Sequence, residues 1–105
     1  MPSKNARFYQ TLGLAMRAGI LSSGEYGALK ALRAGDAAFI LVDEEASENT
    51  KKEFRDGCAY HSVPCWETEA GRLAGSTGKS GRMVAAVCKG PLAEKLMMLT
   101  EQPEP

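Results

Sequence analysis

The sequence predicts an α/β protein: a three-layer alpha-beta-alpha sandwich with a small mixed four-stranded sheet. Two observations carry this prediction. Residues 37–42 and 83–88 are apolar throughout instead of alternating with polar residues, which is typical of strands covered on both faces. Segments with helical spacing of apolar residues alternate with the short strands along the chain, and this order favours helices on both sides of one sheet.

The first helix is predicted over residues 5–18 and ends at Gly19. Its apolar positions recur at helical spacing; they are Phe8, Leu12, Ala15 and Met16. Residues 20–21 then form a very short extended segment. Ser22, with Glu25 three residues later, has the form of a capping box and predicts a second helix to Ala34, closed by Gly35. The strand 37–42 follows, with an acidic turn over residues 43–46.

The second half of the chain repeats this alternation. Ser47 or Asn49 can cap a third helix that runs to about His61, and a short strand follows at residues 65–66. Thr68 is predicted to cap a short helix that ends near Gly75. After the strand 83–88, Gly90 and Pro91 open a last helix through residue 99. Trp66, Met97 and Met98 are expected in the core, and residues 102–105 are expected to be frayed or disordered.

Length and composition indicate one folded domain over residues 1–105. Of the 105 residues, 44% are hydrophobic and 25% are charged, which is the balance of a protein that can bury a core. Nothing approaches the roughly 18 apolar residues of a membrane span, and residues 1–4 do not lead into an apolar signal core. We therefore expect a cytoplasmic protein with no membrane partner.

The cysteines Cys58, Cys65 and Cys88 are odd in number and include no CxxC pair, so neither disulfides nor a zinc site is indicated. Charge is more informative, because the net charge of zero hides a segregation along the chain. Residues 1–40 carry +3 and residues 70–90 carry +4, whereas residues 41–69 carry −5 and the last fifteen carry −2. Clustered Lys and Arg favour a phosphate-bearing partner if the two basic segments meet in the fold.

Residues 75–80 (GSTGKS) look like the end of a phosphate-binding P-loop. A P-loop needs a glycine where this chain has Leu73, and it must run from a strand into a helix, whereas this segment runs from a helix into a strand. Nucleotide hydrolysis is therefore disfavoured. His61, the only histidine, is expected to be structural, and no serine or cysteine has a local activating group. We expect no enzyme activity, metal, cofactor or small-molecule substrate.

Two segments remain as candidates for binding. Residues 71–82 combine four glycines with Lys79, Ser80 and Arg82, which describes a basic, donor-rich loop or an ordinary flexible one. In the second helix, Tyr26, Lys30 and Arg33 fall at i, i+4 and i+7 and share one face. That face is either a basic binding surface or a plain solvated one, and spacing alone does not decide.

A resemblance favours binding. The segments that carry it are 12–19 (LGLAMRAG), 23–35 (SGEYGALKALRAG), 39–42, 46–52 (ASENTKK), Val63–Pro64 and 78–87, and they cover nearly the whole chain. They resemble the kink-turn-binding ribosomal protein family, whose members include large-subunit proteins of archaea and eukaryotes, and especially its small bacterial YlxQ-like branch. The resemblance implies an RNA-binding protein, ribosome-associated or ribosomal-protein-like, whose fold is an alpha-beta-alpha sandwich.

The family sets the start of its second helix, and the loop before its last strand, against a sharply bent RNA. By position, Glu25 would meet a guanine edge, Lys30 a guanine or phosphate, and Arg33 the RNA backbone. The predicted RNA-binding residues are Ser23, Gly24, Glu25, Lys30, Arg33, Lys79, Ser80 and Arg82. Gly24 replaces the family's usual Asn, a principal base reader, and the loop offers glycine amides and charge in place of apolar side chains. A protein-interaction scaffold, favoured by the acidic segment 43–56, is the alternative.

Overall fold

A computed structural model describes residues 6–78 and 82–101 of the chain. The predicted disordered tail at residues 102–105 lies outside these ranges. Within these ranges the elements are, in order, α1 (Ala6–Arg17), β1 (Leu21–Ser23), α2 (Glu25–Ala34), β2 (Ala37–Asp43), α3 (Glu48–His61), β3 (Cys65–Thr68), α4 (Arg72–Thr77), β4 (Val84–Cys88) and α5 (Pro91–Glu101). The predicted α/β class is confirmed.

The four strands form one mixed sheet in the order β1-β4-β2-β3. β4 runs antiparallel to both of its neighbours, pairing Ser23 with Ala85 on one side and Leu41 with Ala85 on the other. β2 and β3 are parallel, and Ile40 lies opposite Cys65. β4, the last strand in the sequence, is therefore an inner strand, and its neighbours β1 and β2 come from the first half of the chain.

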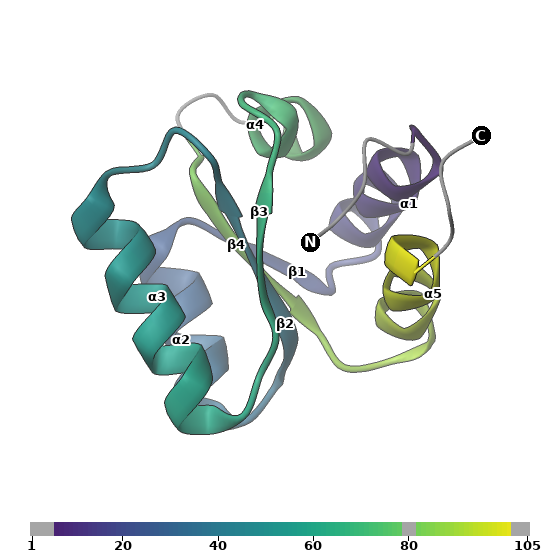
Figure 1. Cartoon of the computed structure of the whole chain (residues 1–105). Coiled ribbons are helices and arrows are strands. Elements are labelled where there is room, and N and C mark those ends of the chain that lie inside the picture. The colour runs from purple at the N-terminus through teal and green to yellow at the C-terminus, as the bar shows by residue number, and fades with distance from the viewer. Residues whose placement is uncertain (1–5, 79–81, 102–105) are drawn as a thin grey trace.

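Helices cover both faces of this sheet, with α1 and α5 on one side and α2 and α3 on the other (Figure 1). Alternate residues of β2 serve the two layers: Phe39 and Leu41 pack with α1 and α5, and Ile40 and Val42 pack with α2 and α3. All four side chains are at most 1% exposed. Two-sided burial explains why this strand reads as an uninterrupted apolar run.

Several predicted helix ends are confirmed. Gly35 ends α2 in the left-handed conformation, and its N–H donates to Leu32 O at 3.2 Å. Ser47 caps α3 by accepting from the Thr50 N–H at 3.1 Å. Among the helices of the described chain, none is long and apolar enough to cross a membrane.

Other local predictions are wrong. Ser22 does not cap α2, because it is paired in β1, and the residue before the helix, Gly24, makes no side-chain cap. Thr68 does not cap α4; it ends β3, and Gly71 precedes that helix. The pairing of β1 with β4 extends the chain through Ser23, and an extended backbone in a sheet outweighs the local capping signal.

The predicted core side chains divide in the same way. Trp66 packs against the α1–α5 layer, with its ring centroid 4.9 Å from that of Phe39, and Met97 also packs there. Met98 is 63% exposed, so its predicted burial is wrong. Adjacent residues of a helix point about 100° apart, and α5 buries only the side that faces α1.

Candidate functional site

Helix α2 begins at a backbone conformation that only glycine adopts readily. Gly24 has φ 92° and ψ 157°, in a region essentially closed to residues with a side chain. Its N–H donates to Val84 O at 2.7 Å, and its carbonyl accepts from the Ala28 N–H at 3.0 Å. The same residue therefore ends the pairing of β1 with β4 and starts the helix.

Arg82 lies directly over this turn. A Cβ placed on Gly24 would stand 2.6 Å from Nη1 of Arg82 and 3.6 Å from its Cζ. The guanidinium thus occupies the space that any side chain at position 24 would need. Of the predicted site residues, the structure brings Ser23, Gly24, Glu25 and Arg82 together, because β1 and β4 are neighbours in the sheet.

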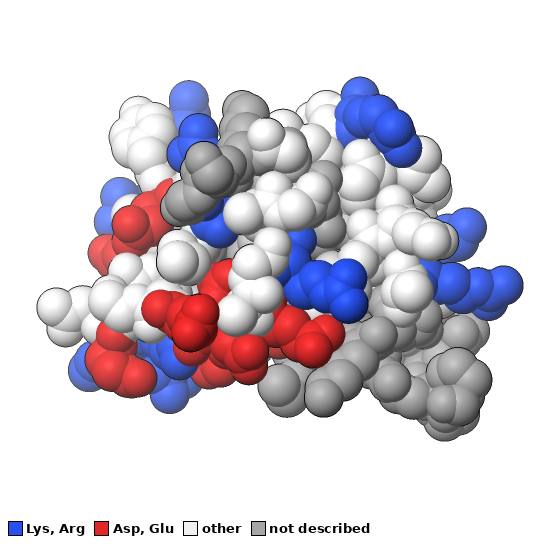
Figure 2. All heavy atoms as spheres, turned by 90° about the horizontal axis from the view of Figure 1, so that it is seen from above, with Lys and Arg blue, Asp and Glu red and all other residues white. Residues whose placement is uncertain are grey.

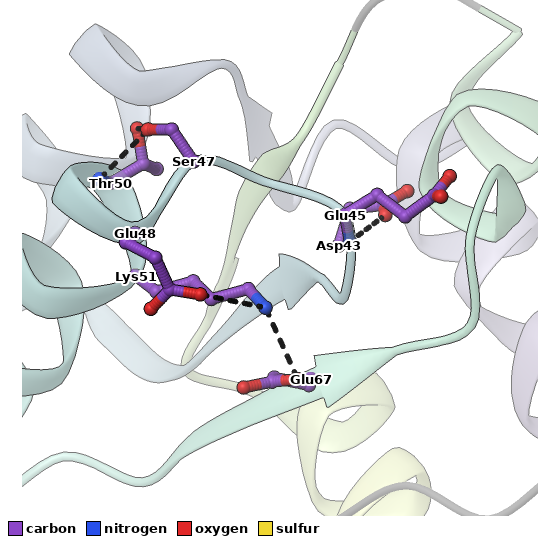
Figure 3. A network of polar contacts seen from close by, with 7 residues as sticks. All are labelled: Asp43, Glu45, Ser47, Glu48, Thr50, Lys51 and Glu67. Carbon is purple, nitrogen blue, oxygen red and sulfur yellow. Dashed lines mark hydrogen bonds and ion pairs between the residues drawn. The ribbon is translucent and has the colours of Figure 1, made fainter.

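Glu25 is held by the start of α3. Its Oε1 accepts from the Thr50 hydroxyl at 3.0 Å. The Ser47 hydroxyl in turn donates to Thr50 Oγ1 at 3.0 Å (Figure 3). The carboxylate is exposed yet oriented by this chain of hydrogen bonds. Sequence reasoning did not predict Thr50 as its partner, since nothing local shows that the starts of α2 and α3 meet.

Lys30 and Arg33 lie on the outward face of α2, as predicted, and both are exposed. Together with Tyr26, Leu29 and Ala34 they line a shallow hollow of about 420 Å³. The predicted residues Lys79 and Ser80 lie outside the described residues.

Asp43 is a buried carboxylate that accepts two backbone hydrogen bonds. Its side chain is 2% exposed; Oδ2 accepts from the Gly71 N–H at 2.9 Å and Oδ1 from the Glu45 N–H at 2.8 Å. The first bond ties the end of β2 to the start of α4. The predicted acidic turn therefore contains a structural carboxylate that sequence reasoning missed, although its position directly after a buried strand is a usable signal.

A group of carboxylates, called the acidic edge here, lies near Asp43 and the ends of β2 and β3. It consists of Glu44, Glu45, Glu48, Glu67 and Glu69. Lys51 lies among these carboxylates, 4.0 Å from Glu48 and 3.9 Å from Glu67 (Figure 3). Seen from above, most red side chains gather near the centre of this face, a second red group lies at the left, and blue side chains lie both against the red ones and at the rim (Figure 2).

A groove of about 850 Å³ lies between α1 and α4 and was not predicted from the sequence. Arg17, Arg72 and Tyr9 line it, together with Gly75 of α4 and Gly78, which ends that helix. The Arg72 guanidinium lies 4.8 Å from the centre of the Tyr9 ring and its Nε is 3.7 Å from Glu69 Oε1. The glycines that line this groove have no side chains to fill it. The groove forms because α1 and α4, which are far apart in the sequence, lie side by side.

No group of three or more His, Cys, Asp or Glu side chains is placed to hold a metal ion within residues 6–78 and 82–101. The three cysteines are free thiols; Cys58 is buried, and Cys65 and Cys88 are partly exposed. The chemical resources of the site are hydrogen-bond donors and acceptors, cations and one exposed aromatic ring. These groups can bind and orient a polyanion.

In the described part of the chain, a mixed sheet between two helical layers defines a small alpha-beta-alpha sandwich protein. The sequence matches the model of the Ribosomal protein L7Ae/L30e/S12e/Gadd45 family over residues 6–96, and the chain belongs to this family. The predicted family is confirmed.

Particular relatives agree. The chain is 39% identical to the RNA-binding protein YlxQ of Bacillus subtilis (strain 168), over 90% of this chain and 95% of that protein. It is also 39% identical to an RNA-binding protein YlxQ of Enterococcus faecium, over 86% and 87% respectively.

Two solved structures have the same fold. One is a protein with unknown function from Bacillus halodurans C, with a TM-score of 0.85, 29% identity and coverage of 93% of this chain and 100% of that chain. The other is a Giardia lamblia 15.5kD RNA binding protein, with a TM-score of 0.74, 16% identity and coverage of 96% and 93%. This second likeness concerns the fold.

Proposed function

We propose that the protein binds RNA, and that it recognises a kink-turn or a related bent RNA in the cytoplasm, as a ribosome-associated or ribosomal-protein-like factor. Family membership and relatives named as RNA-binding proteins support RNA as the partner and a protein that is not an enzyme. The observation that carries the proposal is the position of Arg82 over Gly24, because it joins the two predicted binding segments into one surface.

The binding surface combines three kinds of group. Glu25 offers an oriented carboxylate that can accept from a base edge, which is a contact that reads sequence. Lys30, Arg33 and Arg82 offer cations to the phosphates, and Lys79 and Ser80 belong to the same proposed site. The family usually has Asn at position 24. Here the peptide backbone of Gly24 and the Arg82 guanidinium take its place, so contacts with the RNA phosphates outweigh contacts that read the bases.

Binding alone accounts for the proposed activity. A sharp bend brings phosphates of the RNA close together, and cations that offset their repulsion make the bent form more populated. The acidic edge lies beside Thr50 and Glu25 and repels phosphates, so the RNA should run over α2 and the loop 75–82 and away from β3. No bond in the RNA has to be made or broken.

The test is a titration, at one fixed salt concentration, into a kink-turn RNA and into a control RNA whose sheared G·A pairs are replaced by Watson–Crick pairs. We expect a preference of about tenfold or more, equivalent to about 1.4 kcal/mol. Equal binding to both RNAs would refute bend recognition and leave general RNA binding.

A four-alanine variant at Lys30, Arg33, Lys79 and Arg82 tests the site itself. Each lost phosphate contact should reduce the slope of log affinity against log salt concentration by about one. The matched control is Lys95→Ala, which removes a cation from α5 on the opposite side of the sheet. Unchanged affinity in the four-alanine variant would show that the site lies elsewhere.

The acidic edge favours one second candidate, a protein-interaction scaffold with weak RNA binding. Its carboxylates form a surface suited to a basic protein segment. Under this function, charge reversal in the acidic edge abolishes partner binding, whereas the four-alanine variant leaves it unchanged.

A further inference from the structure

The outward face of α2 carries an aromatic ring that does not pack into the core. Tyr26 is 83% exposed, whereas the inward side of the helix buries Ala28, Ala31 and Leu32. A large apolar ring left in water forgoes the stabilisation that burial would provide. Its neighbours in the hollow of about 420 Å³ include Lys30 and Arg33.

These three side chains form a compact platform. The positions i, i+4 and i+7 lie along one side of a helix, and a rise of 1.5 Å per residue puts Tyr26 and Arg33 about 10 Å apart along the axis. The ring belongs to the first turn, directly after Glu25, so the platform adjoins the proposed bend-binding surface. The Glu25 carboxylate is bonded towards α3 by Thr50, at the start of that helix.

A flat ring beside two cations matches the chemistry of an unpaired nucleotide. The base offers a π-face for stacking on the ring, and the flanking phosphates offer charge to Lys30 and Arg33. A paired base inside a helix is already stacked and presents only its edge. The platform is therefore suited to nucleotides outside the paired stems.

We propose that Tyr26 stacks an unpaired base of the bound RNA next to the bend, with Lys30 and Arg33 on the adjoining phosphates. This inference rests on the proposed function and deepens it, because it names a single-stranded extension as part of the target. The binding site on α2 then gains Tyr26, which lies between the predicted residues Glu25 and Lys30.

The experiment compares a kink-turn RNA ending flush with its stem and the same RNA with a short unpaired extension, placed on either side of the bend in turn. The wild-type protein should bind one of the extended RNAs about tenfold more tightly, the size of one base–aromatic stack. Tyr26→Phe should keep this gain, and Tyr26→Ala should lose it while binding the flush RNA as before. An equal gain in wild type and Tyr26→Ala, or no gain in the wild type, would overturn the inference.

Tyr60→Ala is the matched control, because Tyr60 is 85% exposed and belongs to α3, outside the hollow lined by Tyr26, Lys30 and Arg33. It should behave as wild type with every RNA. An extension made of abasic residues keeps the phosphates and removes the bases. It should therefore abolish the dependence on Tyr26 and retain part of the dependence on Lys30 and Arg33.

An unstructured single-stranded oligonucleotide separates this inference from the proposed function. If the protein does not prefer the kink-turn but binds the oligonucleotide in a Tyr26-dependent way, bend recognition fails and the platform stands. If the kink-turn is preferred and Tyr26→Ala binds all RNAs like wild type, the platform fails and bend recognition stands. Melting curves of both tyrosine variants should match wild type, since exposed side chains contribute little to stability.

Discussion

The guanidinium of Arg82 lies where a side chain of residue 24 would have to be, with Nη1 2.6 Å from a Cβ built on Gly24. Glycine at position 24 is required by the backbone conformation with φ 92°, and a side chain there would also have to move the end of the flexible Arg82 side chain. A side chain at position 24 would therefore have to adopt a strained backbone conformation and share its space with Arg82.

Gly24→Asn tests this relationship. The variant should lose about 1–3 kcal/mol of unfolding free energy, because the new residue must occupy a glycine-only conformation. It should also displace Arg82 and bind RNA more weakly, in spite of restoring the family's base reader. Urea denaturation and RNA titration measure the two effects; tighter kink-turn binding by the variant would contradict the proposed role of Arg82.

Asp43→Ala tests how α4 is anchored. The substitution leaves the N–H groups of Gly71 and Glu45 without their acceptor in a place where Asp43 itself is buried. We expect a loss of about 1–3 kcal/mol, measured by urea denaturation. Asp36→Ala, at an exposed aspartate, is the control and should change stability by much less. Similar losses in both variants would remove the special role of Asp43.

Gly75 and Gly78 should respond to alanine in opposite directions. A Cβ on Gly75 meets nothing within 4 Å, so Gly75→Ala should stabilise the protein by about 0.5–1 kcal/mol. Gly78 has φ 71°, and Gly78→Ala should destabilise it by about 1–2 kcal/mol. Thermal melting decides both. A Gly75→Ala variant that is more stable yet binds RNA less tightly would show that RNA approaches the backbone there.

The thiols of Cys58 and Cys65 should differ in reactivity. A hydrogen bond from the Cys58 thiol lowers the pKa of Cys65, and the same interaction, with burial, raises the pKa of Cys58. Because the thiolate is the nucleophile, iodoacetamide should alkylate partly exposed Cys65 well before buried Cys58. Peptide mass analysis after timed labelling follows both sites, and equal rates in the native protein would be inconsistent with this pairing. In urea the difference should vanish.

Tyr9 should make the fold sensitive to alkali. Burial, above all, raises the pKa of Tyr9 above its ordinary value of 10.0. The folded state then holds the phenol proton more tightly than the unfolded chain does. The contribution of Tyr9 to the free energy of unfolding is therefore fully present below the pKa of the unfolded chain, and it is lost as the pH rises from that value through the raised pKa of the folded state. Tyr9→Phe should reduce the loss of stability between about pH 9 and 11. Urea midpoints across that range provide the measurement, and identical pH profiles would contradict it.

Much of the fold could be predicted from local sequence. The apolar strand 37–42 is recognisable because both of its faces are buried, and Gly35 and Ser47 mark helix ends through bonds to residues close in sequence. The capping box at Ser22 and Glu25 failed for a long-range reason. β4 pairs with β1 and keeps Ser22 extended, and Glu25 bonds to Thr50 instead.

The candidate site was only partly predictable for the same reason. Residue types and helical spacing identified Lys30 and Arg33 as an exposed basic face. The contact between Gly24 and Arg82 depends on the strand order β1-β4-β2-β3, which no local pattern contains. The anchoring of α4 by Asp43 likewise depends on where β2 ends relative to a helix that comes later in the chain.

The inner position of β4 has a consequence during protein synthesis. A nascent chain that has emerged only as far as α4 contains Gly24, Glu25 and Lys30 but has neither the Val84 carbonyl nor Arg82. Its strands β1 and β2 have no partner between them, and long-range pairing of this kind forms late. Incomplete chains should therefore remain unfolded, inert towards RNA and open to proteases, so that binding begins only when translation of the sheet is complete.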